Sequence, residues 1–342
     1  LEKWTNDQYY AMANLFARVR AKGWGGDPRN GDGVRTLYVD AAGELIQPRA
    51  GKPQPPTPLD GKPIAFDDPT DRREALAQWL TAPDNPYFSR AIVNRVWASF
   101  MGQGLVEAVD DLRLSNPASN EPLLAEMSRQ LVEHKYDLKW LMREILRSET
   151  YQRSSAALPE NVGDKRYGSH YYPRRLMAEV LHDAICQTTG EPSKFTATEN
   201  IDSSTTKTDF YKDGTRAIQL YDSAVVSNFL SAFGRNERAI TCECERSNEP
   251  TVVQVLQISN GDVVNGKLAA KDGVIAQLLE EKQSDEAIIE TAYLSALSRR
   301  PTDSEKSQLL EILAATAENE RRQAIEDLYW GVLSSREFLF QH

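Results

Sequence analysis

Residues 85–104 read NPYFSRAIVNRVWASFMGQG, and this stretch decides the class of the fold. Its apolar side chains recur at the three- and four-residue spacing that marks one face of an α-helix. These side chains are Phe88, Ile92, Val93, Val96, Trp97 and Phe100. Asn85 and Pro86 precede the pattern and Gly102 and Gly104 follow it, as turn residues do at helix boundaries. The stretch therefore predicts an amphipathic helix that buries one face.

Most of the chain repeats this helical spacing. Further helices are predicted over 70–80, 123–134, 137–146, 173–189, 223–233, 250–261, 275–281, 286–297, 309–317 and 322–340. Asp137 is placed to cap one of them, and Thr302 with Glu305 forms the pattern of a capping box before another. The polar, Ser/Thr-rich stretch 190–215 lacks a period and is predicted to be a surface excursion.

The N-terminal part departs from this pattern. Residues 5–21 are predicted to form one amphipathic helix behind Thr5. Residues 37–39 and 45–46 are apolar and flank the turn residues 40–43, which predicts a small β-hairpin. The sequence thus indicates a mainly α fold, a multi-helical globular body with a small β-hairpin near the N-terminus.

Length and composition suggest three parts. At 342 residues, the chain exceeds the roughly 250 residues at which single cores stop growing. We expect a first part at 1–65, in which a Pro/Gly/Lys-rich connector follows the hairpin. A main helical domain is predicted at 66–282, and a C-terminal helical hairpin or three-helix unit packed on it at 283–342.

The charge and the hydropathy pattern exclude two classes of partner. The net charge of −10 repels phosphate backbones, so nucleic acid is not expected to bind. No run approaches the ~20 apolar residues of a membrane span. The chain opens at Leu1 with no apolar leader, so any targeting signal is expected to lie on sequence outside it.

The sharpest local motif is RNERAITCECERSNEP at 235–250. On an extended backbone, Cys242 and Cys244 would share one face, as two soft ligands or a redox pair. Alternatively, the cysteines are buried or bridged while arginines pair with the glutamates to stiffen a loop. No second cysteine pair or nearby histidine completes a four-ligand set, so no metal site is predicted. The candidate binding residues here are Arg238, Cys242, Cys244, Glu245 and Arg246, with Glu243 as a catalytic candidate.

A second candidate site lies at 94–113. Asp110 and Asp111 are adjacent carboxyl groups near Arg95, and like charges held together raise one pKa, as acid/base catalysis needs. Asn94 is a further binding candidate beside them. The alternative is that these carboxylates cap the next element and bridge to a neighbouring helix.

Several common catalytic motifs are missing from the sequence. It contains no GxSxG elbow, no P-loop, no HExxH zinc motif and no CxxCH haem attachment motif. These absences argue against several common enzyme classes, and they predict that this chain carries no cofactor of its own.

Five segments together resemble a known family. They are NPYFSRAIVNRVWASFMGQGLVEAVDDLRLSNPASNEPLL (85–124), HKYDLKWLMREILRSETYQRSS (134–155), YYPRRLMAEVLHDAICQTTG (171–190), FGRNERAITCECERSNEPTVVQVLQISNG (233–261) and LYWGVLSSREFLFQH (328–342). The chain resembles, from about Asp71 onward, the C-terminal domain of unknown function of large planctomycete-type, cytochrome c-associated proteins. Residues 1–21 resemble the tail of the domain that precedes it.

The resemblance implies a cellular context. It implies an exported protein, periplasmic or at the cell surface, in which upstream domains of the same protein are partners, a c-type cytochrome domain among them. Haem c would then be attached upstream of Leu1. An exported location would also permit a disulfide involving Cys242, Cys244 or Cys186.

Two functions from different classes are compatible with these observations. The first is a non-catalytic binding or scaffolding module of an exported, cytochrome c-linked protein, which the missing cofactor motifs and the helical content favour. The second is an extracellular or periplasmic enzyme, a hydrolase or an oxidoreductase. Its site would require the 94–113 and 235–246 segments to converge on one cleft.

Overall fold

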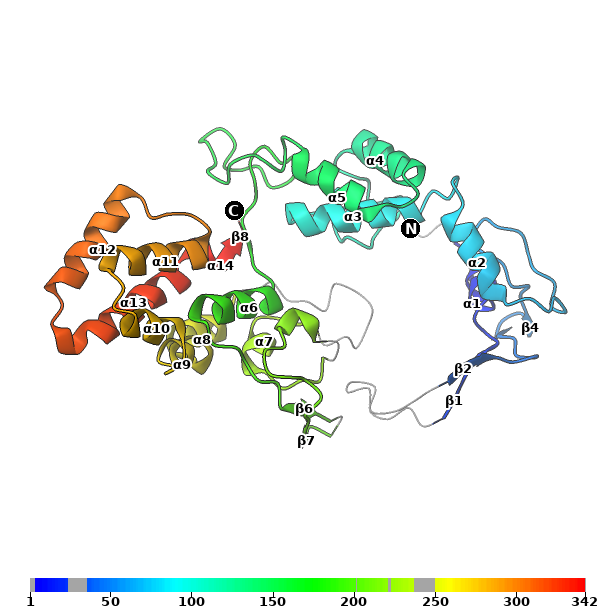
Figure 1. Ribbon diagram of the computed structural model, residues 1–342. Coiled ribbons are helices and arrows are strands. Elements are labelled where there is room, and N and C mark those ends of the chain that lie inside the picture. The colour runs from blue at the N-terminus through cyan, green and yellow to red at the C-terminus, as the bar shows by residue number, and fades with distance from the viewer. Residues whose placement is uncertain (1–3, 24–35, 201, 221–222, 237–249, 342) are drawn as a thin grey trace. The chain divides into compact units, whose positions relative to one another are not determined.

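The computed structural model describes residues 4–23, 36–200, 202–220, 223–236 and 250–341. The chain divides into two compact units (Figure 1). The first unit comprises Leu1–Trp24 and Val34–Tyr172, and the second includes Pro173–His342. The boundaries predicted after residues 65 and 282 each fall inside one of these units.

Helices dominate the first unit, as the sequence predicts. They are α1 (Asn6–Ala13), α2 (Arg72–Thr81), α3 (Phe88–Met101), α4 (Glu121–Glu133) and α5 (Leu138–Arg147). Helix α3 ends at Gly102, whose φ of 80° is left-handed and favours glycine. The Asp137 side chain accepts hydrogen bonds from the backbone amides of Lys139 and Trp140, which confirms the predicted cap of α5.

The core of the first unit joins α3, α4 and α5. Val93, Leu124, Leu131 and Leu141 are fully buried there, and Ile145 is nearly so. Val93 lies on the face of α3 that the sequence predicts to be apolar. Burial of such side chains stabilises the helices by about 1.5–3 kcal/mol each, far more than their intrinsic propensity does.

The N-terminal helix is shorter than predicted. The helix predicted over 5–21 ends at Ala13, and residues Val19–Lys22 form strand β1. The buried Asn14 side chain follows α1, and its amide donates hydrogen bonds to the carbonyl oxygens of Leu45 (3.2 Å) and Gln54 (2.8 Å). The helix does not continue to residue 21 because Val19–Lys22 pair with Thr36–Val39, which lie further along the chain.

The predicted β-hairpin is confirmed in part, because both of its strands are present, each in a separate two-stranded pair. Strand β2 (Thr36–Val39) pairs antiparallel with β1, while β3 (Ile46–Gln47) pairs with β4 (Lys52–Pro53). Both predicted strands therefore exist, but they do not pair with each other. The partner of a short strand is weakly specified by its sequence. Here each predicted strand pairs with a segment that the apolar spacing does not predict to be a strand.

The second unit is also mainly helical. Its helices are α6 (Ala178–Thr189), η1 (Ala217–Gln219), α7 (Asn228–Ala232), α8 (Val252–Asn260), α9 (Asp262–Leu268), α10 (Val274–Glu280), α11 (Asp285–Leu297), α12 (Asp303–Ala315), η3 (Glu318–Glu320), α13 (Arg321–Leu333) and α14 (Arg336–Leu339). The stretch predicted to be an aperiodic excursion contains a hairpin of β6 (Ala197–Glu199) and β7 (Thr205–Lys207).

Two helices of the second unit are shorter than predicted because residues at their predicted ends form a pair of β-strands. Strand β5 (Arg174–Arg175) pairs antiparallel with β8 (Phe340–Gln341), so α6 starts only at Ala178. The pattern predicted over 322–340 is split into α13 and α14, since the Ser335 side chain caps a new helix by accepting from the Phe338 amide. The β5–β8 pair joins the start of this unit to its end.

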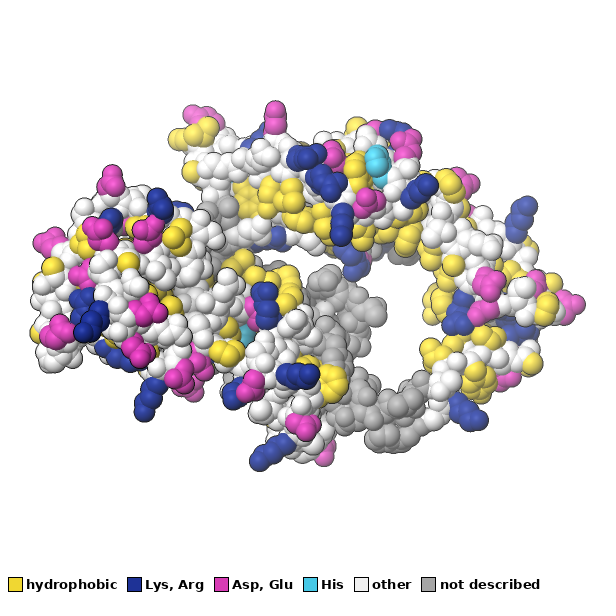
Figure 2. Space-filling view, in the orientation of Figure 1, with side chains coloured by type: hydrophobic (Ala, Val, Ile, Leu, Met, Phe, Trp, Pro, Cys, Tyr) yellow, Lys and Arg dark blue, Asp and Glu magenta, His cyan; other side chains and the backbone are white. Residues whose placement is uncertain are grey.

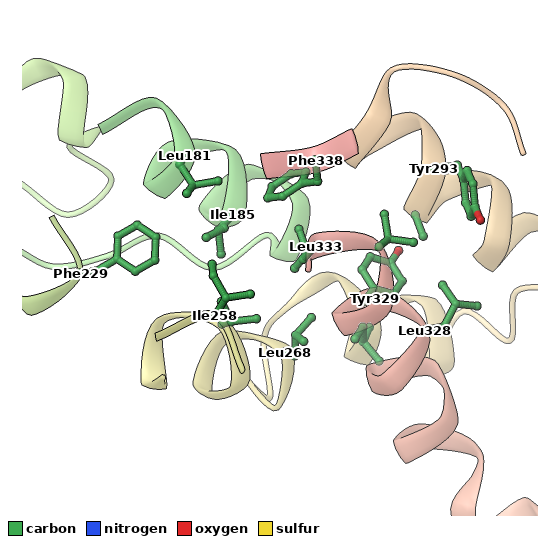
Figure 3. Packing of buried hydrophobic residues seen from close by; sticks show 14 of the residues in the cluster. Leu181, Ile185, Phe229, Ile258, Leu268, Tyr293, Leu328, Tyr329, Leu333 and Phe338 are labelled. Atoms are coloured by element: carbon green, nitrogen blue, oxygen red, sulfur yellow. The ribbon is translucent and has the colours of Figure 1, made fainter. Parts of the chain in front are cut away.

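One apolar cluster holds the second unit together. It draws on every helix from α6 to α14, and Figure 3 shows side chains of α6, α8, α13 and α14 directed into it. Ile185, Ile288 and Ile325 are fully buried in this cluster, although more than a hundred residues separate the first two. Residues of the predicted 283–342 part thus share a core with residues 178–278.

Candidate functional site

A groove of about 670 Å³ lies in the second unit, among α11, α12, α13 and the start of α14. Its lining is largely apolar, and its position between helices is typical of ligand or peptide sites. The residues that line it are Tyr293, Leu297, Glu305, Leu309, Ile312, Leu313, Thr316, Glu320, Gln323, Ala324, Asp327, Leu328, Gly331, Val332, Ser335 and Glu337. We call this feature the C-terminal groove.

Helix α12 forms one wall of the C-terminal groove, and the sequence fixes where that helix starts. The Thr302 hydroxyl accepts from the Glu305 amide at 3.3 Å, and the Glu305 carboxylate accepts from the Thr302 amide at 2.7 Å. This confirms the predicted capping box. Leu309, Ile312 and Leu313 of this helix line the groove, and Ile312 remains 57% exposed. An isoleucine this exposed beside a groove offers apolar contact to a partner.

Helix α13 forms the opposite wall and contains a glycine in its interior. Gly331 lines the groove, and a Cβ atom added there would meet no other atom within 4 Å. A glycine inside a helix costs about 1 kcal/mol relative to alanine, and no packing within the described part of the unit requires it here. The open space above Gly331 lets another molecule approach the helix backbone closely.

The lining of the groove carries acidic but no basic side chains. The ionisable residues in the lining are Tyr293 and four carboxylates, Glu305, Glu320, Asp327 and Glu337. Figure 2 shows acidic and basic side chains interspersed over the part of the surface that α12 and α13 form. The lining itself thus combines an apolar floor with carboxylates.

Arg299, outside the lining, neutralises one end of the groove. Its guanidinium lies 2.9 Å from Glu305 and 2.6 Å from Glu337, and 5.3 Å from the centre of the Tyr293 ring. The hydrogen bond from Arg299 lowers the pKa of Glu305 to about 2. Within the described residues, Glu320 and Asp327 lie in no ion pair, so the other end keeps its negative charge.

The structure places the sequence-predicted site at 94–113 within the first unit. Arg95 pairs with Asp110, and Arg113 pairs with Asp111. Asn94 is fully buried; its amide donates to the carbonyl oxygens of Val106 and Val109, both at 3.0 Å, and its oxygen accepts from the Val106 amide at 2.9 Å. Asn94 thus fastens the loop that carries the two aspartates.

The electrostatics of this segment bear on its proposed acid/base role. The hydrogen bond from Arg113 lowers the pKa of Asp111, which keeps that carboxyl group ionised. The acid/base role of Asp110 and Asp111 stays a prediction. Arg95 and Asp110 are each close to half exposed.

The second sequence-predicted site lies outside the described residues. This applies to Arg238, Cys242, Glu243, Cys244, Glu245 and Arg246. Next to that segment, Arg235 donates to the carbonyl oxygen of Val225 at 3.2 Å, and the Phe233 carbonyl oxygen accepts from Arg175 at 3.0 Å. The convergence of this motif with 94–113 stays a prediction.

Sequence reasoning missed the C-terminal groove, although part of its signal was present. The apolar spacing of Leu309, Ile312 and Leu313 predicts a buried face, but it does not say that a gap remains beside that face. Gly331 within a helical pattern was a further sign, because an interior glycine often has a packing or functional reason.

In the part of the chain that the structure describes, no group of three or more His, Cys, Asp or Glu side chains is arranged to hold a metal ion. None of the described helices has both the length and the apolar character needed to cross a membrane.

The fold and the groove define a mainly α-helical protein with small two-stranded sheets and an apolar, acid-rimmed groove in its second unit. The chain matches the family model described as a protein of unknown function (DUF1553), PSD1, over residues 72–313. This match spans more than half of the chain, so the chain belongs to that family. It confirms a domain of unknown function beginning near Asp71. No curated protein and no solved structure matches the chain.

Proposed function

We propose that this chain is a non-catalytic binding module whose C-terminal groove takes up an amphipathic helical segment with basic side chains. The observation that carries the proposal is the lining of the groove, which combines an apolar floor with four carboxylates and contains no lysine or arginine. Helix-in-groove recognition uses apolar anchors one helical turn apart, with charges at the rim that set orientation.

The occupant follows from charge and space. A basic segment is attracted by Glu320 and Asp327, and the net charge of −10 on the chain adds to this attraction at long range. Near Gly331 the open space accommodates an apolar anchor, which would contact Ile312 on the facing wall. An acidic partner would meet repulsion at the same rim.

The resemblance to cytochrome c-associated proteins suggests where such a segment comes from. We propose that the partner belongs to another domain of the same exported protein, with a c-type cytochrome domain as the first to test, and that this chain itself holds no cofactor. The purified chain should then show no stoichiometric haem, flavin or metal by absorption spectroscopy and elemental analysis. A tightly held redox cofactor in this chain would contradict the proposed role.

The groove is tested with a fluorescent helical peptide of leucine and lysine, about 18 residues long, titrated by anisotropy. Gly331→Leu fills the open space and should weaken binding about tenfold or more, whereas Gly331→Ala keeps nearly all of it. Asp327→Lys should weaken binding about threefold to tenfold at low salt. Glu149→Lys, an exposed change in the first unit, is the matched control and should leave binding near its original strength.

Two results would contradict a site in this groove. One is equal affinity of the wild type and Gly331→Leu, when circular dichroism shows both to be folded. The other is equal affinity for a peptide in which glutamates replace the lysines. Binding that responds to Glu149→Lys as strongly as to Asp327→Lys would show general charge attraction in place of a built groove.

A further inference from the structure

A second cluster of polar side chains lies on α6, away from the residues that line the C-terminal groove. His182 and Cys186 are one helical turn apart, and the Cys186 sulfur lies 3.7 Å from the His182 Nδ1 atom. Ser193, in the loop after α6, places its hydroxyl 3.7 Å from the same sulfur and 2.9 Å from His182 Nε2. A thiol within reach of an imidazole that a third group orients is the arrangement of an activated nucleophile.

The imidazole of this cluster is held rigidly. His182 is only 2% exposed, and the rings of Phe195 and Phe229 lie with their centres 5.8 Å and 5.7 Å from its own. The Asp183 carboxylate lies 3.5 Å from His182 Nδ1. A carboxylate beside an imidazole stabilises the positive charge that the ring carries after accepting a proton.

Asp183 is in turn fixed by the backbone of η1. Its carboxylate accepts hydrogen bonds from the amides of Ala217 (2.6 Å) and Ile218 (3.1 Å), and the Arg216 guanidinium lies 3.4 Å away on the exposed side. The acidic neighbour of the ring therefore cannot rotate away.

A second cation faces the cluster from α9. Lys267 is 8% exposed, and its ammonium group donates to the carbonyl oxygen of Glu191 at 2.7 Å. Among the described residues, no carboxylate lies within ion-pairing distance of Lys267. A buried ammonium without a paired carboxylate favours negative charge nearby, and a thiolate at Cys186 would supply it.

These neighbours outweigh the effect of burial on the thiol. Burial by itself raises the pKa of Cys186, but the hydrogen bond with His182 and the charges of His182 and Lys267 lower it further than burial raises it. Cys186 is partly exposed and forms no disulfide within the described part of the chain. Cys186 is thus the more exposed member of the pair, while the imidazole of His182 is shielded from solvent.

We infer that Cys186 is a reactive thiol that exchanges with small disulfides. His182 accepts the thiol proton, and the Cys186 thiolate attacks one sulfur atom of a disulfide RSSR. The new bond joins Cys186 to one RS group as the RS–SR bond breaks, and the leaving thiolate takes up the proton as RSH. The Cys186 sulfur is oxidised to a mixed disulfide, and one RS group is reduced. This inference does not depend on the proposed groove function.

The test uses the full chain with Cys242→Ser and Cys244→Ser, so that Cys186 is the single thiol. Its reaction rate with oxidised glutathione is followed by intact-mass spectrometry across pH, together with the faster reaction with dithiobis(nitrobenzoate). The rate should reach half its maximum below the pH of about 8.5 at which an ordinary thiol does. At neutral pH it should exceed the rate of a small cysteine peptide roughly threefold or more.

Substitutions distinguish the cluster from a thiol that is merely accessible. His182→Gln and Lys267→Met should each move the midpoint of the profile toward higher pH, while Lys267→Arg should largely preserve it. Gln187→Ala, an exposed change next to Cys186, is the matched control and should leave the profile unchanged. If His182→Gln does not fold, the Lys267→Met and Lys267→Arg pair carries the test. A midpoint at or above the ordinary value, or one that the folded cluster variants do not move, would overturn the inference.

Discussion

Two regions of the molecule bring titratable side chains together in opposite ways. In the 94–113 segment, Arg95 and Asp110 form an ion pair in which both side chains are close to half exposed. In the second unit, His182 and Asp183 lie side by side and are almost completely buried, at 2% and 4% exposure. Charges in water interact weakly because solvent screens them, whereas a buried polar group must be satisfied by the protein. We therefore expect the loss of a buried, hydrogen-bonded polar side chain to cost more stability than the loss of an exposed ion pair.

The largest expected effect tests the buried side of this comparison. Asp183→Ala removes the acceptor of two backbone hydrogen bonds in η1, and the Ala217 amide is left buried without a partner. We expect the free energy of unfolding to fall by about 3 kcal/mol. Chemical denaturation of both proteins measures the change.

Asp183→Asn is the matched control for that loss. The asparagine keeps one oxygen acceptor, so it should cost less than half as much as alanine. An alanine variant as stable as the wild type would show that the two amides find other partners and would remove the basis of the comparison.

A second substitution tests burial inside the 94–113 segment itself. Asn94→Ala should lower the free energy of unfolding by about 2 kcal/mol, because three buried hydrogen bonds to Val106 and Val109 are lost. Thermal and urea unfolding would both register the loss. The idea fails if Asn94→Ala costs no more than a substitution of its neighbour Arg95.

An ion pair of intermediate exposure should give an intermediate effect. Glu305, about one third exposed, has its pKa lowered to about 2 by Arg299. Since the folded-state pKa lies below the unfolded value near 4.5, the pair stabilises the protein above pH 4.5 and loses this effect as the pH falls toward 2. After allowance for solvent screening, the loss should be about 1 kcal/mol.

The measurement compares wild type and Glu305→Gln by denaturation at pH 7 and pH 3. The variant should be less stable at pH 7, and the gap between the two proteins should narrow at pH 3. A gap of the same size at both values would show that Glu305 acts through its capping contacts with Thr302 and not through its charge.

The smallest effect is expected at the surface. Arg95→Ala should change the free energy of unfolding by less than about 0.5 kcal/mol, because its pair with Asp110 is exposed and screened. Careful urea titrations at two salt concentrations would detect it. A loss approaching that of Asn94→Ala would break the comparison and point to a role for Arg95 beyond this pair.

Much of the architecture was predictable from local pattern. The helix that buries Val93, the Asp137 cap and the Thr302 capping box depend on residues within one or two turns of each other, and the structure confirms them. The N-terminal helix is shorter than predicted because Val19–Lys22 pair with Thr36–Val39, and no local spacing reveals such a partner. The two strands predicted nearby are present, but their partners likewise lie in segments that the local pattern does not mark as strands.

The candidate sites also differ in how far the sequence predicts them. The sequence pointed to charged clusters, and at 94–113 the structure gives these side chains mutual pairing and a fastened loop. The groove near Gly331 and the thiol beside Lys267 carry no complete sequence motif, because their residues come from helices brought together only by folding.

By itself, then, the sequence determined a mainly helical chain, the position of most helices and several of their caps, since these follow from contacts between residues three or four apart. The pairing of the strands, the short first helix and the groove among α11, α12 and α13 follow from tertiary contacts. These features depend on contacts between segments that are far apart in the sequence. The free energy that stabilises such contacts comes from burying apolar surface throughout the unit.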